Sequence, residues 1–463
     1  MNAVQLKRAS RGHRNRLMAD ILAGIDAGAL VEGRKLPSVR VLARQHGVSP
    51  HTAAEVYQRL VAIGRVEARP GSGYFVRSAW VRNGPAETPA PADALWERRI
   101  EAPGDRIRVD AGGGWLPHDW HYREGMAAAL RTVARSPTKT EGYGPPNGFE
   151  PLRAYFAQRL NDRGVRTQAS DIVLTQGASQ GLDLAVRALL NSGDTAVVED
   201  PAYPPILELL HARGVRILSI SRLETGPDVG ALEQILATSK IQALYTNTTL
   251  QNPTGTSTHA AIAHRLADLA KAHDFTIIED DIFADLSPTP IIPIAAFDND
   301  GRVIHVSSLS KTIAPTLRVG YLLANAATLQ SIMRLKILSA LASSELSERI
   351  AYAALTQTRY RRHLRDVRER LGTSQARVQA VLLAHGVELS HRPVGGMFVW
   401  GRILSALPAG KIWQAGVDAG VLLAPGESFR ADGRASPWWR FNVTQCEDHA
   451  LSGFLSGEAL RAD

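Results

Sequence analysis

The segment Val303-Ile304-His305-Val306-Ser307-Ser308-Leu309-Ser310-Lys311 runs from an apolar stretch through three serines to a lysine, and Arg318 follows seven residues later. We expect residues 303–306 to form a buried strand, which places Lys311 just after its end. A lysine in that position can form an imine with an aldehyde, because desolvation and neighbouring charge activate its amine. The hydroxyls and Arg318 suit a phosphate, which arginine binds through two parallel hydrogen bonds. The segment therefore predicts a site for pyridoxal 5′-phosphate (PLP).

Further segments support this interpretation, each with a different chemical task. Thr175-Gln176-Gly177-Ala178-Ser179-Gln180 lies between a predicted strand and an apolar helix, so its backbone N–H groups can hold a phosphate. Glu279-Asp280-Asp281 lies at the end of a predicted strand, where a buried carboxylate can keep a pyridine nitrogen protonated. The remaining segments offer an aromatic ring, an amide, a glycine pair and an arginine: Asp200-Pro201-Ala202-Tyr203-Pro204, Asn252-Pro253-Thr254-Gly255, Gly395-Gly396-Met397-Phe398 and Arg440-Phe441-Asn442.

Strand and helix patterns alternate from about residue 106, which is typical of an α/β domain with a mostly parallel sheet. Strands are expected at residues 172–174, 196–198, 243–245, 276–278 and 303–306. The helical run of residues 343–384 indicates a smaller C-terminal subdomain from about residue 340. Residues 78–105 are rich in Pro, Ala and Glu, as in a linker. The predicted division is therefore residues 1–78, a linker over 79–107, and an α/β domain over 108–463.

The charge of the chain is concentrated at its N-terminal end. Residues 1–80 hold 13 Lys and Arg residues against 5 Asp and Glu, a difference equal to the net charge of +8 of all 463 residues. The remaining residues are balanced. A basic module beside a neutral body favours a polyanionic partner, and nucleic acid is the first candidate.

The basic module has the order of a winged helix-turn-helix. Apolar spacing predicts a helix over residues 15–27, and Ser38 can cap a short helix over residues 39–45. Ser49 and Pro50 begin a third helix, which runs from residue 51 to about 63. Two short strands then flank a glycine-rich hairpin tip at residues 69–73. We expect the inner face of the third helix to be Ala54, Val56, Tyr57 and Leu60.

The stretch from Leu36-Pro37-Ser38-Val39-Arg40 to Arg69-Pro70-Gly71-Ser72-Gly73-Tyr74-Phe75-Val76 resembles the GntR family of bacterial regulators over about residues 12–77. In that family the third helix enters the major groove of double-stranded DNA and the wing reaches the minor groove. Many members carry Arg where this chain has Pro50, which leaves His51 to read bases. The resemblance implies DNA contacts from Arg40, Ser49, His51, Thr52, Arg69 and Gly71.

Residues 108–460 resemble the fold-type I aminotransferases, and a winged helix followed by this domain resembles the MocR subfamily of GntR regulators. The resemblance implies that Lys311 binds the PLP aldehyde, Asp280 pairs with the ring nitrogen and Asn252 with the ring oxygen. It also implies that Tyr203 stacks on the cofactor ring and that Arg440 binds a substrate carboxylate. The implied phosphate ligands are Ala178, Ser179, Ser308, Ser310, Arg318 and, from the neighbouring subunit of a homodimer, Tyr143. Simpler interpretations are packing for Tyr203, a turn for Ser310 and a surface ion pair for Arg440.

One departure separates the functional hypotheses. Catalytic relatives carry a tyrosine three residues after the aspartate, or in some regulators two, whereas this chain has Phe283 and Ile282. Without that hydroxyl we expect PLP binding with weakened amino transfer. The favoured hypothesis is a regulator of vitamin B6 or amino-acid metabolism genes that senses PLP, or an amino compound joined to it. The alternatives are a working aminotransferase with an accessory DNA-binding module, and a DNA-binding protein whose large domain is a dimerisation scaffold.

The amino-acid composition limits the cellular compartments in which this protein is expected. Hydrophobic residues make up 44% and charged residues 21%, as in a globular protein. The single cysteine, Cys446, excludes a disulfide framework, and the 14 histidines show no metal-ligand spacing. No apolar run approaches a membrane span, and the apolar stretch near the N-terminus carries Asp20 and Asp26, unlike a signal peptide. A cytoplasmic location is expected.

Overall fold

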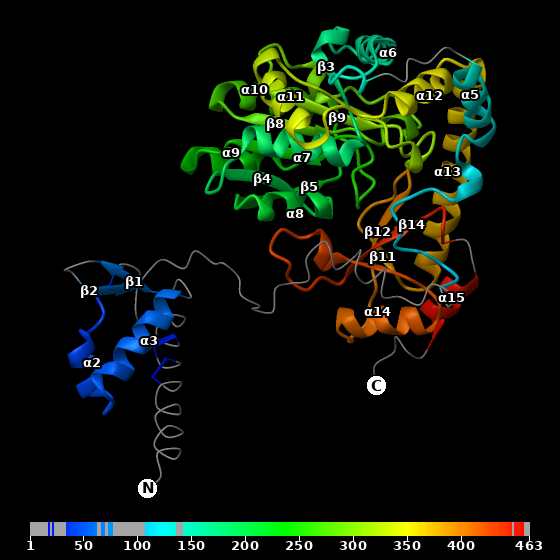
Figure 1. The fold of residues 1–463 in the computed structure, drawn as a ribbon. Coiled ribbons are helices and arrows are strands. Elements are labelled where there is room, and N and C mark those ends of the chain that lie inside the picture. The colour runs from blue at the N-terminus through cyan, green and yellow to red at the C-terminus, as the bar shows by residue number, and fades with distance from the viewer. Residues whose placement is uncertain are drawn as a thin grey trace. The chain divides into compact units, whose positions relative to one another are not determined.

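The structure is a computed structural model that describes residues 17–18, 21–22, 34–62, 66–69, 73–76, 107–135, 142–446 and 449–457. The chain divides into two compact units, Met1–Thr88 and Pro89–Asp463 (Figure 1). Most of the predicted first helix, the hairpin tip at residues 70–72 and the linker before residue 107 lie outside the described residues. The domain boundaries predicted near residues 78, 107 and 340 remain predictions.

The first unit contains the predicted winged-helix elements. They are helices α2 (Val39–Gln45) and α3 (Pro50–Ala62) and the antiparallel strands β1 (Val66–Arg69) and β2 (Gly73–Val76). The Ser38 hydroxyl accepts a hydrogen bond from the Val41 amide, so this predicted cap is confirmed. On α3 the buried alanine is Ala53, and Ala54 is only half-buried, which corrects the predicted inner face. The reason is helical spacing, because Ala53 lies three and four residues before Val56 and Tyr57.

The second unit is built on an eight-stranded sheet of order β3-β10-β9-β8-β7-β4-β5-β6. Neighbouring strands from β9 to β5 are parallel, β10 runs antiparallel to β3 and β9, and β6 is antiparallel to β5. All five strands predicted here from sequence are present. The strand bounds are β3 (Ile172–Thr175), β4 (Thr195–Asp200), β5 (Arg216–Leu223), β6 (Gly226–Pro227), β7 (Ala243–Asn247), β8 (Thr276–Asp280), β9 (Val303–Ser308) and β10 (Gly320–Leu323).

Helices cover both faces of this sheet, which makes a three-layer α/β fold (Figure 1). One face packs against α7 (Ala178–Leu189), α8 (Pro204–Ala212) and α11 (Ala326–Ala340). The other face packs against α5 (Arg123–Arg135), α6 (Glu150–Asn161), α9 (Val229–Thr238), α10 (Ala260–His273) and α12 (Glu345–Leu355). Alternate residues of a strand therefore lie in different hydrophobic cores. Leu244 and Ile277 pack in the core beside α6 and α10, whereas Tyr245 and Ile278 pack in the core beside α7 and α8.

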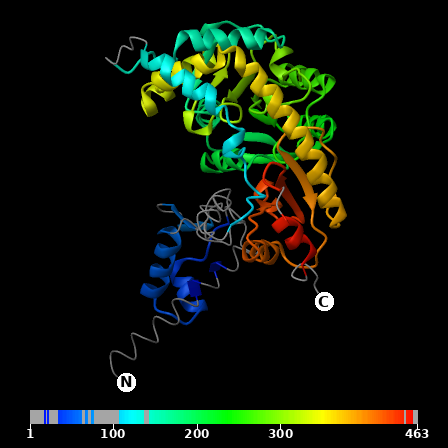
Figure 2. The same cartoon turned by 90° about the vertical axis from the view of Figure 1, so that its right-hand side faces the viewer.

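The C-terminal part adds a four-stranded antiparallel sheet of order β11-β12-β14-β13. Its strands are β11 (Glu388–Leu389), β12 (Phe398–Arg402), β13 (Ala424–Pro425) and β14 (Trp438–Asn442), with helices α14 (Ala409–Asp418) and α15 (His449–Ser456). The long helix α13 (Thr358–Ala384) joins the two sheets' cores, and Figure 2 shows it running from one to the other. The helical run of residues 343–384 is thus two helices, α12 and α13.

Short 3₁₀ turns connect these elements: η1 (His118–Trp120), η2 (Ala169–Asp171), η3 (Ala284–Leu286), η4 (Ile294–Ala296), η5 (Pro315–Leu317) and η6 (Gly426–Phe429). Among the helices that the structure describes, none combines the length and the apolar character needed to cross a membrane.

Candidate functional site

A cavity of about 640 Å³ opens beside the carboxyl ends of the central strands and the N-terminus of α7. Its volume lies in the usual range of small-molecule sites. In α/β sheets, ligands bind at this edge, where the loops after the strands meet. The predicted residues that line it are Ala178, Ser179, Tyr203, Asn252, Asp280, Ser310, Lys311, Arg318 and Arg440.

Lys311 lies three residues after β9, and its side chain enters the cavity. Its Nζ donates a hydrogen bond to the carbonyl oxygen of Gly114 at 2.5 Å. Burial, with a smaller contribution from the positive charge of Arg440, lowers the pKa of Lys311 to about 8, and Asp280 opposes the shift. A lowered pKa leaves more of the amine unprotonated near neutral pH, and the unprotonated amine is the nucleophile.

A phosphate-sized cradle forms between β3 and α7. Gly177 precedes α7 with φ of 79°, a conformation that favours glycine, and it leaves the first amides of the helix pointing outward. A Cβ added at Gly177 would fall 2.6 Å from the guanidinium of Arg318, so a larger residue here would push the Arg318 side chain out of its position. Arg318 in turn donates to the Gln176 carbonyl at 2.7 Å. Backbone amides and a guanidinium therefore converge as a phosphate requires.

Ser308 and Ser310 act together rather than as two equal ligands. Ser310 lines the cavity, whereas Ser308 is hydrogen-bonded beneath it, with 2.8 Å between the two hydroxyl oxygens. The Ser308 hydroxyl also accepts a hydrogen bond from the Ser310 amide and donates one to the Val319 carbonyl oxygen at 3.2 Å. Ser308 thus holds the turn in shape and leaves the cavity face to Ser310.

Arg440 is buried, with 6% of its surface exposed, so the simpler interpretation of this residue as part of a surface ion pair is wrong. It donates to Asn252 Oδ1 at 2.9 Å and to the Gly112 carbonyl. Its guanidinium lies between the rings of Phe398 and Phe429, at 4.7 and 5.0 Å from their centroids. These contacts hold a positive charge rigidly at the cavity wall, as binding of a carboxylate requires.

Aromatic side chains form another part of the wall. Tyr203 lines the cavity, and burial raises its pKa to about 12, so its hydroxyl stays protonated. Phe283 also faces the cavity and meets Phe398 edge to face at 5.6 Å. Ile282 lines the same wall, so both positions at which a tyrosine was considered lie at the site, and both lack a hydroxyl.

Two features of the site differ from expectation. Tyr143 lies outside the cavity lining and is 77% exposed, so its predicted contact with a neighbouring subunit remains a prediction. Sequence reasoning missed the residues Gly112, Gly114, Trp115, Asn247 and Tyr245. The run of glycines at residues 112–114 was a visible signal in the sequence. The structure gives its reason at Gly112, where an added Cβ would fall 2.4 Å from the Ala424 amide nitrogen. Tyr245 carried no local signal, since it reads as an ordinary strand residue.

The predicted DNA-contact residues divide by exposure. Arg40, Ser49 and His51 are exposed, as groove or phosphate contacts require. Thr52 is buried, and its amide and hydroxyl both hydrogen-bond to Ser49. Ser49 caps α3 by accepting a hydrogen bond from the Thr52 amide at 3.1 Å, and the predicted DNA contact of Thr52 remains a prediction. The Arg69 side chain and Gly71 lie outside the described residues.

Fold and site together define a class: a winged helix-turn-helix module followed by an aminotransferase-like domain. Bacterial regulatory proteins of the gntR family match residues 13–76, and the family of class I and II aminotransferases matches residues 117–455. The chain belongs to the class I and II aminotransferase family, and with its GntR module it has the architecture of the MocR subfamily of regulators. The fold class and family predicted from the sequence are confirmed.

The similar proteins include both regulators and enzymes. The HTH-type transcriptional regulator YdcR of Escherichia coli K12 is 28% identical over 90% of this chain and 92% of its own length. A second regulator of that strain, YjiR, is 31% identical over 76% of this chain and 77% of its own. The solved kynurenine aminotransferase of Pyrococcus horikoshii, in complex with PMP, has a TM-score of 0.73 and 27% identity, and covers 79% of this chain and 94% of its own.

Proposed function

We propose that this protein is a PLP-binding transcription regulator whose aminotransferase-like domain senses an effector. The observation that carries the proposal is the convergence of an amine, a carboxylate, an amide, an arginine and a phosphate cradle on one cavity, in a chain that also has a GntR module. Regulators of the same two-part architecture are similar over most of their length. The cytoplasm is the compartment this function requires.

The cavity residues fit PLP group by group. Gly177, which has no Cβ, lets the Arg318 guanidinium approach the start of α7, where Arg318 would supply the counter-charge of a phosphate. Asp280 would pair with the ring nitrogen, Asn252 with the ring oxygen, and Tyr203 would stack on the ring. The phosphate would be held by Ala178, Ser179, Ser310 and Arg318, with Ser308 supporting Ser310 and Tyr143 contributed by the second subunit of a homodimer.

When bound, PLP supplies an electrophilic aldehyde and a ring that withdraws electrons. Lys311 would hold the aldehyde end of PLP through its amine, which its lowered pKa keeps more often unprotonated. Arg440 orients an effector that carries a carboxylate. Phe283 offers no hydroxyl to the ring oxygen, so this chain retains binding groups while lacking one donor that assists amino transfer.

Regulation requires that the effector bind two states of the protein with different affinity. PLP, or an amino compound joined to it, would bias the protein between a form that binds DNA tightly and one that binds weakly. A homodimer would place two winged helices on two half-sites. Genes of vitamin B6 or amino-acid metabolism are the targets suggested by the chemistry of the effector.

The first test of this proposal is titration of the purified protein with PLP, followed by absorbance. Binding through Lys311 should give a visible absorption band that is abolished in Lys311→Ala. Lys271→Ala is the matched control, because Lys271 is an exposed lysine paired with Asp300 at 3.1 Å, and this variant should keep the band. A band of equal strength in Lys311→Ala would contradict the proposal.

A working aminotransferase is the second candidate, and the amine, carboxylate, amide and arginine that line the cavity favour it. It predicts repeated turnover with an amino acid and a keto acid. The regulator hypothesis predicts at most single half-reactions, well below the typical enzyme rates of about 1–1000 per second. Steady turnover in that range would establish the enzyme hypothesis.

A further inference from the structure

Both carboxylate oxygens of Asp280 accept hydrogen bonds from the protein itself. The Tyr245 hydroxyl donates to Oδ2 at 3.0 Å, and the Ile282 amide donates to Oδ1 at 3.2 Å. The tyrosine is fully buried in β7, with 1% of its surface exposed. One contact comes from a backbone group, which side-chain substitution does not remove. The other depends on a single phenol hydroxyl.

The register of the sheet explains why Tyr245 reaches Asp280. In the parallel pair of β7 and β8, Asn247 lies opposite Asp280 and Tyr245 lies opposite Ile278. Residues two apart on a strand share a face, so Tyr245, Asn247 and Asp280 lie on the same side of the sheet. Asn247 holds the backbone there, because its Nδ2 donates to the Asp280 carbonyl at 2.7 Å.

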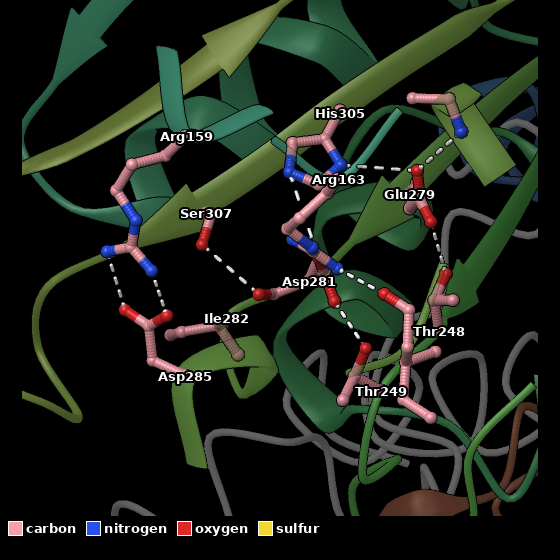
Figure 3. Close-up of polar contacts among 12 residues, drawn as sticks. Arg159, Arg163, Thr248, Thr249, Glu279, Asp281, Ile282, Asp285, His305 and Ser307 are labelled. Carbon is pink, nitrogen blue, oxygen red and sulfur yellow. Dashed lines mark hydrogen bonds and ion pairs between the residues drawn. The ribbon is translucent and has the colours of Figure 1, made fainter. Parts of the chain in front are cut away.

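The two chain neighbours of Asp280, Glu279 and Asp281, are fixed by contacts of their own (Figure 3). Glu279 is bonded to the Thr248 hydroxyl at 2.7 Å and to His305 Nδ1 at 3.2 Å. Asp281 is paired with Arg163 at 2.6 Å and accepts from the Thr249 hydroxyl at 2.6 Å. These contacts anchor the end of β8 and leave the orientation of the Asp280 side chain to Tyr245 and the Ile282 amide.

We propose that Tyr245 is a positioning residue that holds the Asp280 carboxylate in the orientation and charged form needed to pair with the ring nitrogen of PLP. The choice of PLP as ligand rests on the proposed function. The contact between Tyr245 and Asp280 is independent of it. Tyr245 acts only through Asp280 and is absent from the cavity lining.

The electrostatics agree with this geometry. Burial raises the pKa of Asp280 to about 6, and the hydrogen bonds from the Ile282 amide and the Tyr245 hydroxyl oppose that rise. Burial, with Asp280 nearby, raises the pKa of Tyr245 well above its ordinary value, so its hydroxyl stays a donor. Removing this hydroxyl favours the neutral acid at Asp280, which lacks the charge that keeps a ring nitrogen protonated.

The first experiment measures PLP affinity and the absorption spectrum of the bound form in three proteins: wild type, Tyr245→Phe and Tyr321→Phe. Tyr321 is the matched control, a buried tyrosine of β10 in the same sheet that stacks on Phe156. We expect roughly tenfold weaker binding and an altered spectrum in Tyr245→Phe, since hydrogen bonds to charged groups are the stronger ones. Tyr321→Phe should match wild type.

Binding by Tyr245→Phe within twofold of wild type, with the same spectrum, would overturn the inference. Absence of PLP binding by the wild type would instead contradict the proposed function. The two failures are therefore distinguishable.

A second experiment needs no PLP. It measures urea unfolding of wild type, Tyr245→Phe, Asp280→Ala and the double variant. Loss of the hydroxyl should lower the urea midpoint where Asp280 is present and have little effect in the Asp280→Ala background, because a polar group left without its partner carries the cost. If Tyr245→Phe alone fails to fold, a folded double variant gives the same support. Equal losses in both backgrounds, or failure of both to fold, would overturn the inference.

Discussion

Lys311 owes its reactivity to residues that are distant in sequence. Burial is the main cause of its lowered pKa, and Arg440, 129 positions away in the numbering, adds a positive charge that disfavours the ammonium form. Asp280 on β8 opposes both. The pKa of Lys311 thus depends on residues from both sheets of the second unit.

This balance predicts a pH dependence. The rate of PLP capture should rise with pH with a midpoint near the lowered pKa of about 8, far below the ordinary lysine value of roughly 10.4, because only the unprotonated amine attacks an aldehyde. Arg440→Gln should move the midpoint upward, and Asp280→Asn should move it downward. Stopped-flow absorbance across pH 6–10 measures all three. Midpoints that are identical in the three proteins would contradict the assignment.

Phe283 offers a gain-of-function test at the residue scale. We predict that Phe283→Tyr raises the rate of single amino-transfer half-reactions by about tenfold, the value of one hydrogen bond to a charged oxygen. Phe283→Leu is the control, because it changes the ring contact with Phe398 without adding a hydroxyl. Single-turnover absorbance records the rate. No gain in Phe283→Tyr would show that the missing hydroxyl does not limit the reaction.

At the scale of elements, the loop that follows β7 carries Asn252 and is held by a buried ion pair. Arg222 and Glu199 approach to 2.5 Å with both side chains fully buried. Glu199 also accepts from Thr246, and Arg222 donates to Thr256 at 2.8 Å. Strands β4, β5 and β7 and this loop are thereby tied together behind the cavity.

Breaking this pair should destabilise the second unit strongly. We predict that Arg222→Met lowers the free energy of unfolding by about 3–5 kcal/mol, because Glu199 is left as a buried charge without its counter-ion. The exposed pair of Arg265 and Glu233 is the comparison. Arg265→Met should change the free energy of unfolding by less than about 1 kcal/mol. Urea unfolding monitored by circular dichroism measures both. Equal effects of the two substitutions would refute the structural role.

Sequence predicted those features that depend on local pattern. The cap at Ser38, five strands of the large sheet and the junction of strand and helix at residues 175–180 each follow from short-range sequence pattern. Contacts between distant segments were not predictable, such as Tyr245 with Asp280 or Arg440 with Asn252. They depend on strand order and register, which one sequence does not specify. The hydrogen bond between the Thr52 and Ser49 hydroxyls was likewise not predicted.

At the scale of the whole molecule, one chain carries a GntR-type DNA-binding module and an aminotransferase-like domain with a ligand-sized cavity. Coupling between two binding sites is reciprocal, so an effector that changes DNA affinity by some factor must have its own affinity changed by DNA by the same factor. The chain places its net positive charge in the first 80 residues, which suits phosphate contacts there.

Two substitutions in the first unit should separate phosphate contacts from base contacts. We predict that Arg40→Ala weakens binding to all DNA sequences alike and reduces the salt slope of log affinity by about one, the change for one lost phosphate contact. His51→Ala should relax sequence preference with little change in the slope. Fluorescence anisotropy at several salt concentrations measures both. The reverse pattern would exchange the two assignments.

The central claim is that PLP bound at Lys311 controls DNA binding. The most direct test measures the affinity of the full-length protein for the DNA upstream of its own gene, with and without PLP, at fixed salt. We expect PLP to change the affinity for DNA several-fold in the wild type and to have no such effect in Lys311→Ala. An unchanged affinity in the wild type, or an equal change in Lys311→Ala, would contradict the claim.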